Sequence, residues 1–190
     1  ILSKDGGLNS KYSESINLHT QDYLNTEYLG FYLKDSLSPI KYLKIRQAIN
    51  HGFDRKKMLK YLRNNIGTPA INGFVPRGMP SFDDNLIGFY YDKEKAQKLI
   101  EEVKLLNDGN LDPIILSTNS SYLDLCEFIQ NELSKIGLEI EINVSPPATH
   151  RQMVATSKLS FFRASWIADY PDAENYLSLF YSKNHSPNGP

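Results

Sequence analysis

One stretch, residues 113–144, constrains the fold of this chain more than any other. It opens with the apolar run Ile114-Ile115-Leu116 and closes with alternating apolar residues from Leu138 to Val144. Between these runs, apolar residues recur at helical spacing: Leu123, Cys126, Ile129, Leu133 and Ile136. Gly137 follows, at a position typical of a helix end. A strand–helix–strand unit with a connection of this length predicts parallel strands, a right-handed crossover and an α/β fold.

Further elements are predicted on both sides of this unit. Apolar runs indicate strands over residues 27–34 and 159–166. Helical spacing and capping residues predict helices over residues 41–53, 54–62, 93–109, 150–155 and 173–181. The Pro- and Gly-rich stretch 67–88 is predicted to be a long loop. We therefore expect a mixed sheet with flanking helices, in a single domain over residues 1–190.

Composition narrows the classes of function. The chain has 190 residues with 41% hydrophobic and 23% charged, which is typical of one globular domain. Its net charge is −1 and no basic cluster is present, which argues against a nucleic-acid partner. Cys126 is the single cysteine, so the chain has neither an internal disulfide nor a cysteine zinc cluster. No apolar run reaches the roughly 18 residues that span a bilayer, and a secreted origin would need a targeting segment upstream of Ile1.

The segment from Arg163 to Asp172 holds the densest group of residues suited to ligand binding. It carries a cation, Trp166 and an acid at the end of a predicted strand, where open α/β sheets commonly hold ligands. Tyr170 precedes a proline and should be extended, so the helix begins after it and Asp172 is the better N-cap. Asp169 is then left without a structural task. The alternative is that Asp169 turns the loop and Trp166 fills the core.

No other group of residues predicts catalysis, a metal or a cofactor. The four histidines are dispersed, without metal-ligand spacing, and are expected at the surface or half-buried. The chain has no Gly-rich phosphate loop and no nucleophile elbow. Cys126 lies on the apolar stripe of its helix, which indicates a buried, inert thiol. Arg46 is interpreted as a structural helix-surface cation and Asp54 as a helix cap.

Eight short segments, in register, resemble one known family. These are Tyr28-Leu-Gly-Phe31, Ile45-Arg-Gln-Ala-Ile-Asn50, Phe53-Asp-Arg55, Gly67-Thr-Pro-Ala70, Val75-Pro76, Tyr91-Asp-Lys-Glu-Lys-Ala96, Ile129-Gln130 with Ile136-Gly-Leu138, and Trp166-Ile-Ala-Asp-Tyr-Pro-Asp172. From Tyr28 onwards the chain resembles the C-terminal lobe of the periplasmic oligopeptide- and dipeptide-binding proteins of ABC transporters, the family-5 extracellular solute-binding proteins.

The resemblance implies a set of ligand-binding residues. In peptide-binding members, the acid that matches Asp169 pairs with the α-ammonium group of the ligand, and the aromatic that matches Trp166 lines a side-chain pocket. In the oligopeptide-binding type, the arginine that matches Arg163 can take the C-terminal carboxylate. Tyr170 is the fourth expected ligand-binding residue. These pairings suit the charges involved, since a carboxylate fits the planar guanidinium fork.

The resemblance also implies a function without catalysis or cofactor. The chain would be part of the C-terminal lobe of a monomeric, periplasmic or cell-surface receptor, anchored as a lipoprotein through an upstream segment. Its partners would be a peptide, the missing N-terminal lobe and the permease subunits of an ABC importer. Two alternatives remain open: the same scaffold could bind a sugar, nickel complex or haem, or a similar α/β unit could serve a hydrolase. For the hydrolase alternative, the sequence offers no grouping of a nucleophile with a base.

Overall fold

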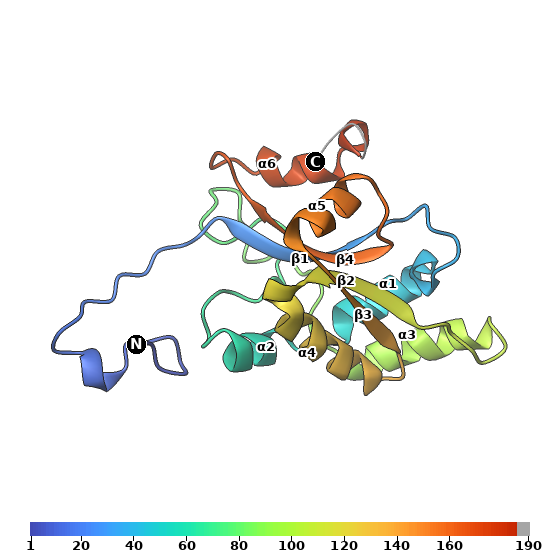
Figure 1. The fold of residues 1–190 in the computed structure, drawn as a ribbon, viewed down its shortest axis with the longest axis horizontal. Helices are drawn as coiled ribbons and strands as arrows, with labels where there is room; N and C mark the ends of the chain where they lie inside the picture. Colours follow the sequence, from blue (N-terminus) through green and yellow to red (C-terminus); the bar gives the residue numbers. More distant parts are fainter. Residues whose placement is uncertain (186–190) are drawn as a thin grey trace.

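Four strands form one mixed sheet in the computed structural model, which describes residues 1–185 (Figure 1). The strands are β1 (Asn25–Phe31), β2 (Ile114–Asn119), β3 (Ile140–Ser145) and β4 (Phe161–Ile167). Their order across the sheet is β1-β4-β2-β3. β2 runs parallel to both β3 and β4, whereas β1 is antiparallel to β4. The predicted α/β class, the mixed sheet and the parallel pair around the central helix are confirmed.

Helices cover both faces of this sheet (Figure 1). They are α1 (Leu43–His51), α2 (Arg55–Leu62), α3 (Lys93–Leu105), α4 (Leu123–Ser134), α5 (Pro147–Ala155) and α6 (Glu174–Leu177). Short 3₁₀ turns occur at Ser10–Tyr12, Pro39–Lys41, Ser120–Tyr122, Ser178–Phe180 and Ser182–Asn184. In Figure 1, α1 to α4 lie below the sheet and α5 and α6 lie above it. Among residues 1–185, no helix has the length and apolar character that crossing a membrane requires.

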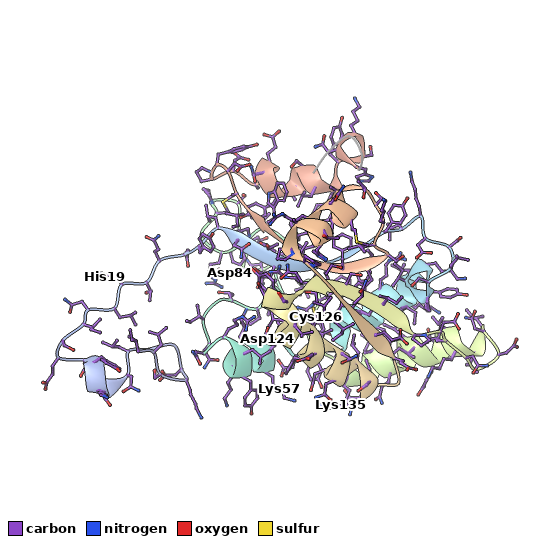
Figure 2. The ribbon with its side chains drawn as sticks, in the orientation of Figure 1. His19, Lys57, Asp84, Asp124, Cys126 and Lys135 are labelled. Carbon is purple, nitrogen blue, oxygen red and sulfur yellow. The ribbon has the colours of Figure 1, made fainter. Side chains whose placement is uncertain are left out.

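The main core lies between the sheet and α1, α3 and α4. Ile45, Ala48 and Ile49 of α1 are fully buried, as is Leu133 of α4. Cys126 is also fully buried in this core, and burial raises the pKa of its thiol (Figure 2). The prediction of a buried thiol is therefore confirmed.

Three helix boundaries follow the capping residues that the sequence indicated. The Asp54 carboxylate accepts hydrogen bonds from the backbone N–H groups of the first turn of α2, at 2.9 and 3.1 Å. Asp92 accepts from the Lys95 N–H at 2.9 Å and so caps α3. Gly137 has φ of 83°, the left-handed conformation expected after a helix end. These local predictions are confirmed.

The predicted helix over residues 173–181 is wrong in length. Only Glu174–Leu177 is α-helical, and a 3₁₀ turn follows it. The Ser178 hydroxyl donates to the Asn175 carbonyl at 3.1 Å, and the Asn184 amide donates to the Ser178 carbonyl at 3.1 Å. These side chains occupy carbonyls that a longer helix would use, so the chain turns instead.

The predicted N-cap of this helix is shifted by one residue. Ala173, not Asp172, holds the N-cap position and makes no side-chain capping bond. The Asp172 carboxylate still accepts the Glu174 N–H at 2.8 Å. Asp172 therefore stabilises the start of α6 from the position before the N-cap and not from the N-cap itself.

A buried acid links α2 to α4. The Glu132 side chain is only 6% exposed and pairs with Lys57 at 3.1 Å and Lys135 at 2.8 Å (Figure 2). Burial alone would raise the pKa of Glu132, but the two ammonium groups outweigh burial and hold the pKa below its usual value of 4.5. The ionised form is thus the one that the folded chain stabilises.

We expect Glu132→Gln to lower the free energy of unfolding by about 1 to 2 kcal/mol at neutral pH, because two half-exposed lysines lose their shared anion. Since the folded-state pKa of Glu132 is depressed, its contribution is present above pH 4.5 and is lost as the pH falls through the folded-state value. Urea unfolding of wild type and variant across this range measures the difference. Glu101→Gln, at an exposed position of α3, is the control. If wild type and Glu132→Gln still differed as much in free energy of unfolding at acidic pH as at neutral pH, the prediction would be contradicted.

Candidate functional site

Three of the four predicted ligand-binding residues lie at or beyond the carboxyl end of β4, whereas Arg163 lies in the first half of the strand. Arg163 and Trp166 belong to the strand, and Asp169 and Tyr170 follow in the turn that leads to α6 (Figure 1). This end of β4 adjoins the start of β1, since the Ala168 N–H donates to the Leu24 carbonyl at 3.1 Å. The site is thus built on the edge where β1 and β4 meet.

Asp169 presents an uncommitted carboxylate at this edge. Its side chain is exposed, and within residues 1–185 it has no hydrogen bond or ion pair. Asp172, three residues later, is instead engaged by the N–H of Glu174. Tyr170, next to Asp169, is 48% exposed. The carboxylate of Asp169 is therefore available to a cation from outside the described chain.

Trp166 is half-buried and fixed by one hydrogen bond. Its indole Nε1 donates to the Asn175 side-chain oxygen at 2.8 Å, and Asn175 is buried on α6. This bond satisfies the polar end of the indole, which frees the remaining ring surface for apolar contacts. The arrangement ties the orientation of Trp166 to α6.

Arg163 is the most enclosed of the four. It is 6% exposed, and its guanidinium carbon lies 3.1 Å from the ring centroid of Tyr122. Its Nη2 forms an ion pair with the Glu27 carboxylate, although neither Nε nor Nη2 has a hydrogen bond with acceptable geometry among the described residues. Burial lowers the pKa of Arg163 to about 10, so the guanidinium remains charged at neutral pH.

Arg163 and Trp166 are not brought together. They are three positions apart on one strand, and strand residues alternate between faces, so the two side chains leave opposite faces of β4. Their partners agree with this: Arg163 contacts Tyr122 after β2, whereas Trp166 bonds to α6. The sequence placed the two in one cluster because they are close along the chain.

Glu27 and Tyr122 are the site residues that the sequence did not reveal. Glu27 begins a predicted apolar strand. Because buried acids are usually paired with a cation, an acid in such a run could have indicated an ion-pair partner. The side chain of Glu27 is 41% exposed and accepts from the Asn25 amide at 3.0 Å. Tyr122 carried no local signal, since its contact with Arg163 comes from a different element.

Residues interpreted as structural behave as such. Arg46 donates from Nη1 to the carbonyls of Ile40 and Lys41 at 2.7 and 3.0 Å. Two histidines are more buried than expected: His51 is 3% and His150 4% exposed. Each places a ring nitrogen within 2.9 Å of a backbone carbonyl, which satisfies one polar atom of each buried ring. In residues 1–185, no cluster of three or more His, Cys, Asp or Glu could hold a metal.

Two small cavities lie away from the predicted residues. One of about 190 Å³ lies between Leu37 and Asp112, and another of about 260 Å³ lies beside α6, lined by Leu177 and Tyr181. Neither is lined by Asp169, Trp166 or Arg163.

Known proteins resemble this chain along most of its length. Haem-binding protein A of Haemophilus influenzae is 28% identical over 88% of the chain and 31% of its own length. The oligopeptide-binding protein OppA of Bacillus subtilis is 27% identical over 98% of the chain and 34% of its own length. The structure of the periplasmic binding protein DppA from Helicobacter pylori, in complex with the peptide STSA, superposes with a TM-score of 0.74 and 24% identity, covering 85% of this chain and 30% of that one.

These matches establish both fold and family. The superposition confirms the fold as that of a periplasmic binding protein. The chain spans about a third of the length of the curated relatives that it matches. The family model for bacterial extracellular solute-binding proteins, family 5 Middle, matches residues 3–188. This chain belongs to the family-5 bacterial extracellular solute-binding proteins.

Proposed function

We propose that this chain is part of a receptor that binds peptides outside the cytoplasm, between two lobes, and delivers them to the permease of an ABC importer. The relative from B. subtilis is named as an oligopeptide-binding protein. The observation that carries the proposal is the exposed Asp169 carboxylate, which has no partner within residues 1–185. A peptide brings the complementary group, its α-ammonium.

A closed cleft would strengthen this pairing. When two lobes exclude water, the attraction between carboxylate and ammonium rises because the local dielectric falls. Trp166, oriented by Asn175, and the exposed Tyr170 supply apolar ring surface beside Asp169. Together these residues would hold a peptide's first residue by charge and its side chain by packing.

The second wall of the cleft would come from other parts of the receptor. Residues 1–190 form one domain in this proposal, a portion of the C-terminal lobe. The receptor is monomeric, is held at the membrane through an upstream lipidated segment, and performs no chemistry on its ligand. These features follow the family resemblance, and the relatives reported above are named for binding.

Haem is the second candidate ligand, because one relative is a haem-binding protein. The charges at the site favour a peptide. Haem carries two propionate carboxylates, and the exposed acid Asp169, which is unpaired within residues 1–185, would repel them. Arg163, the nearby cation, is buried and already paired with Glu27.

Calorimetric titration of the full-length receptor with trialanine tests the proposal. We expect saturable binding, and N-acetylation of the peptide should weaken it by at least about tenfold, because the acetyl group removes the cation that Asp169 would meet. Haem and a disaccharide are the comparison ligands. Equal affinity for the acetylated peptide, or binding of haem or sugar without binding of peptides, would contradict the proposal.

A further inference from the structure

The guanidinium of Arg163 is shielded from solvent by its own partners. The Arg163 side chain is 8% exposed, whereas that of Glu27, its ion-pair partner, is 41% exposed. The ring of Tyr122 covers the guanidinium from another side. A ligand that approaches this edge of the sheet therefore meets the carboxylate of Glu27 before the cation of Arg163.

The register of the sheet holds this ion pair in place. Glu27 pairs with Ser165 across the β1–β4 ladder, and Leu29 pairs with Arg163. Glu27 and Arg163 are thus diagonal neighbours on the same face, a separation that long side chains bridge. The Asn25 amide donates to Glu27 at 3.0 Å and holds the carboxylate from its other side. The pair is set by backbone pairing and not by chance contact of two mobile side chains.

The backbone also fixes Tyr122, just beyond the neighbouring strand β2. It ends the 3₁₀ turn Ser120–Tyr122 that directly follows β2. The Asn119 side chain accepts the Ser121 N–H at 3.0 Å and fixes the start of this turn. Arg163 therefore lies between one partner on β1 and another in the turn that follows β2, and the position of its guanidinium is specified from both sides.

The backbone of Glu27 lies only a few residues along the sheet from that of Asp169. Its partner residue Ser165 precedes Asp169 by four positions, which corresponds to at most about 13 Å of extended chain. A peptide anchored by its ammonium at Asp169 could extend this far within about four residues. A C-terminal carboxylate that reached the ion pair would meet the more exposed partner, Glu27, before Arg163.

An internal ion pair leaves a ligand carboxylate little to gain. To bind Arg163, the ligand would have to displace Glu27 and leave that carboxylate without its cation. One carboxylate would replace another, so the net change in binding free energy would be close to zero.

On this basis we propose that Glu27 is a specificity-determining residue: it keeps Arg163 neutralised, so the receptor does not use Arg163 to recognise the C-terminal carboxylate of a bound peptide. This inference rests on the proposed peptide binding and adds to it a statement about the other ligand terminus. It replaces the role that family resemblance suggested for Arg163 with that of a structural cation.

The test compares each peptide with its C-terminal amide in the full-length receptor. Peptides of two to five alanines, all with a free N-terminus, place the C-terminus at different distances from Asp169. The measured quantity is the ratio of the Kd of the amide to that of the free acid. We expect Glu27→Gln to raise this ratio by at least about tenfold for one or more lengths, because the Arg163 cation becomes available to a carboxylate.

The double variant Glu27→Gln/Arg163→Gln completes the experiment. It removes both charges, and its ratios should agree with those of wild type within about threefold, the spread expected when no charged contact is lost. Glu141→Gln, at an exposed position of β3 on the opposite edge of the sheet, should also leave the ratios unchanged.

Each result separates this inference from the proposed function. A double variant whose ratios fall about tenfold or more below those of wild type would show that Arg163 already reads the carboxylate, and would overturn the inference. An unchanged ratio in a folded Glu27→Gln receptor would overturn it as well. If Glu27→Gln does not fold, the comparison of wild type with the double variant decides alone. Absence of peptide binding by wild type would refute the proposed function itself.

Discussion

Asp169→Asn in the full-length receptor is expected to weaken binding of a free tripeptide by about 2 to 5 kcal/mol, which corresponds to roughly 30- to 5,000-fold in Kd. The asparagine keeps the size of the side chain and removes its charge, so the ligand ammonium would be desolvated in the closed cleft without an anion. Asp169 is exposed and has no partner among the described residues, so the substitution should leave the thermal stability of the unliganded receptor unchanged.

The matched control for this variant is Asp172→Asn. Asp172 is exposed and lies in the same turn, but its carboxylate accepts the Glu174 N–H. Its replacement should therefore affect stability slightly and leave peptide affinity within about threefold of wild type. The N-acetylated tripeptide adds a second control, because it lacks the ammonium and should bind wild type and Asp169→Asn equally. An Asp169→Asn receptor that binds free peptide as tightly as wild type would exclude Asp169 as the ammonium partner.

The parts of the fold that could be predicted from the sequence are those determined by residues close together along the chain. The β2–α4–β3 unit was readable because apolar periodicity changes from strand to helix and back within residues 113–144. The Asp54 and Asp92 caps act on N–H groups two or three residues away. Gly137 likewise fulfils a requirement of its own backbone.

What could not be predicted depends on contacts between distant segments. The placement of β1 beside β4 joins residues that are more than a hundred positions apart, and no local pattern specifies that register. The partners of Arg163 follow from this placement, since Glu27 comes from β1 and Tyr122 from the turn after β2. The length of the last helix was missed for a related reason, because Asn184 bonds back to Ser178 from beyond its end.

The candidate site shows the same division. Asp169 could be singled out locally: the Tyr170-Pro171 step excluded it from the following helix, and no other structural task remained. For Arg163, local reasoning gave a cation near the end of a strand but neither its face nor its partner. Arg163 and Trp166 lie on opposite faces of β4 because side chains alternate along a strand, and this becomes clear once the bounds of β4 are known. Asp169 is unpaired among the described residues and Arg163 is neutralised, so we expect the receptor to recognise the ammonium group of a peptide and not its C-terminal carboxylate.

Phe161→Ala in the 190-residue chain is expected to lower the free energy of unfolding by about 3 to 5 kcal/mol. Phe161 is fully buried and stacks on Phe31 with ring centroids 5.0 Å apart. It also begins β4 at the point where this strand pairs with both β1 and β2, through Phe31 and Leu116. Removal of the ring would leave a cavity at the junction of three strands, where the surrounding backbone has little freedom to close it.

Urea unfolding measures this effect, with the single tryptophan, Trp166, as a fluorescent reporter on the same strand. Tyr23→Ala removes an aromatic side chain that is 66% exposed, and should change stability by no more than about 0.5 kcal/mol. A Phe161→Ala chain with an unchanged unfolding midpoint would contradict the assignment of Phe161 to the core. The same strand carries Arg163 and Trp166 and leads directly into Asp169. The packing that stabilises this strand is therefore also the packing that positions the proposed ligand site.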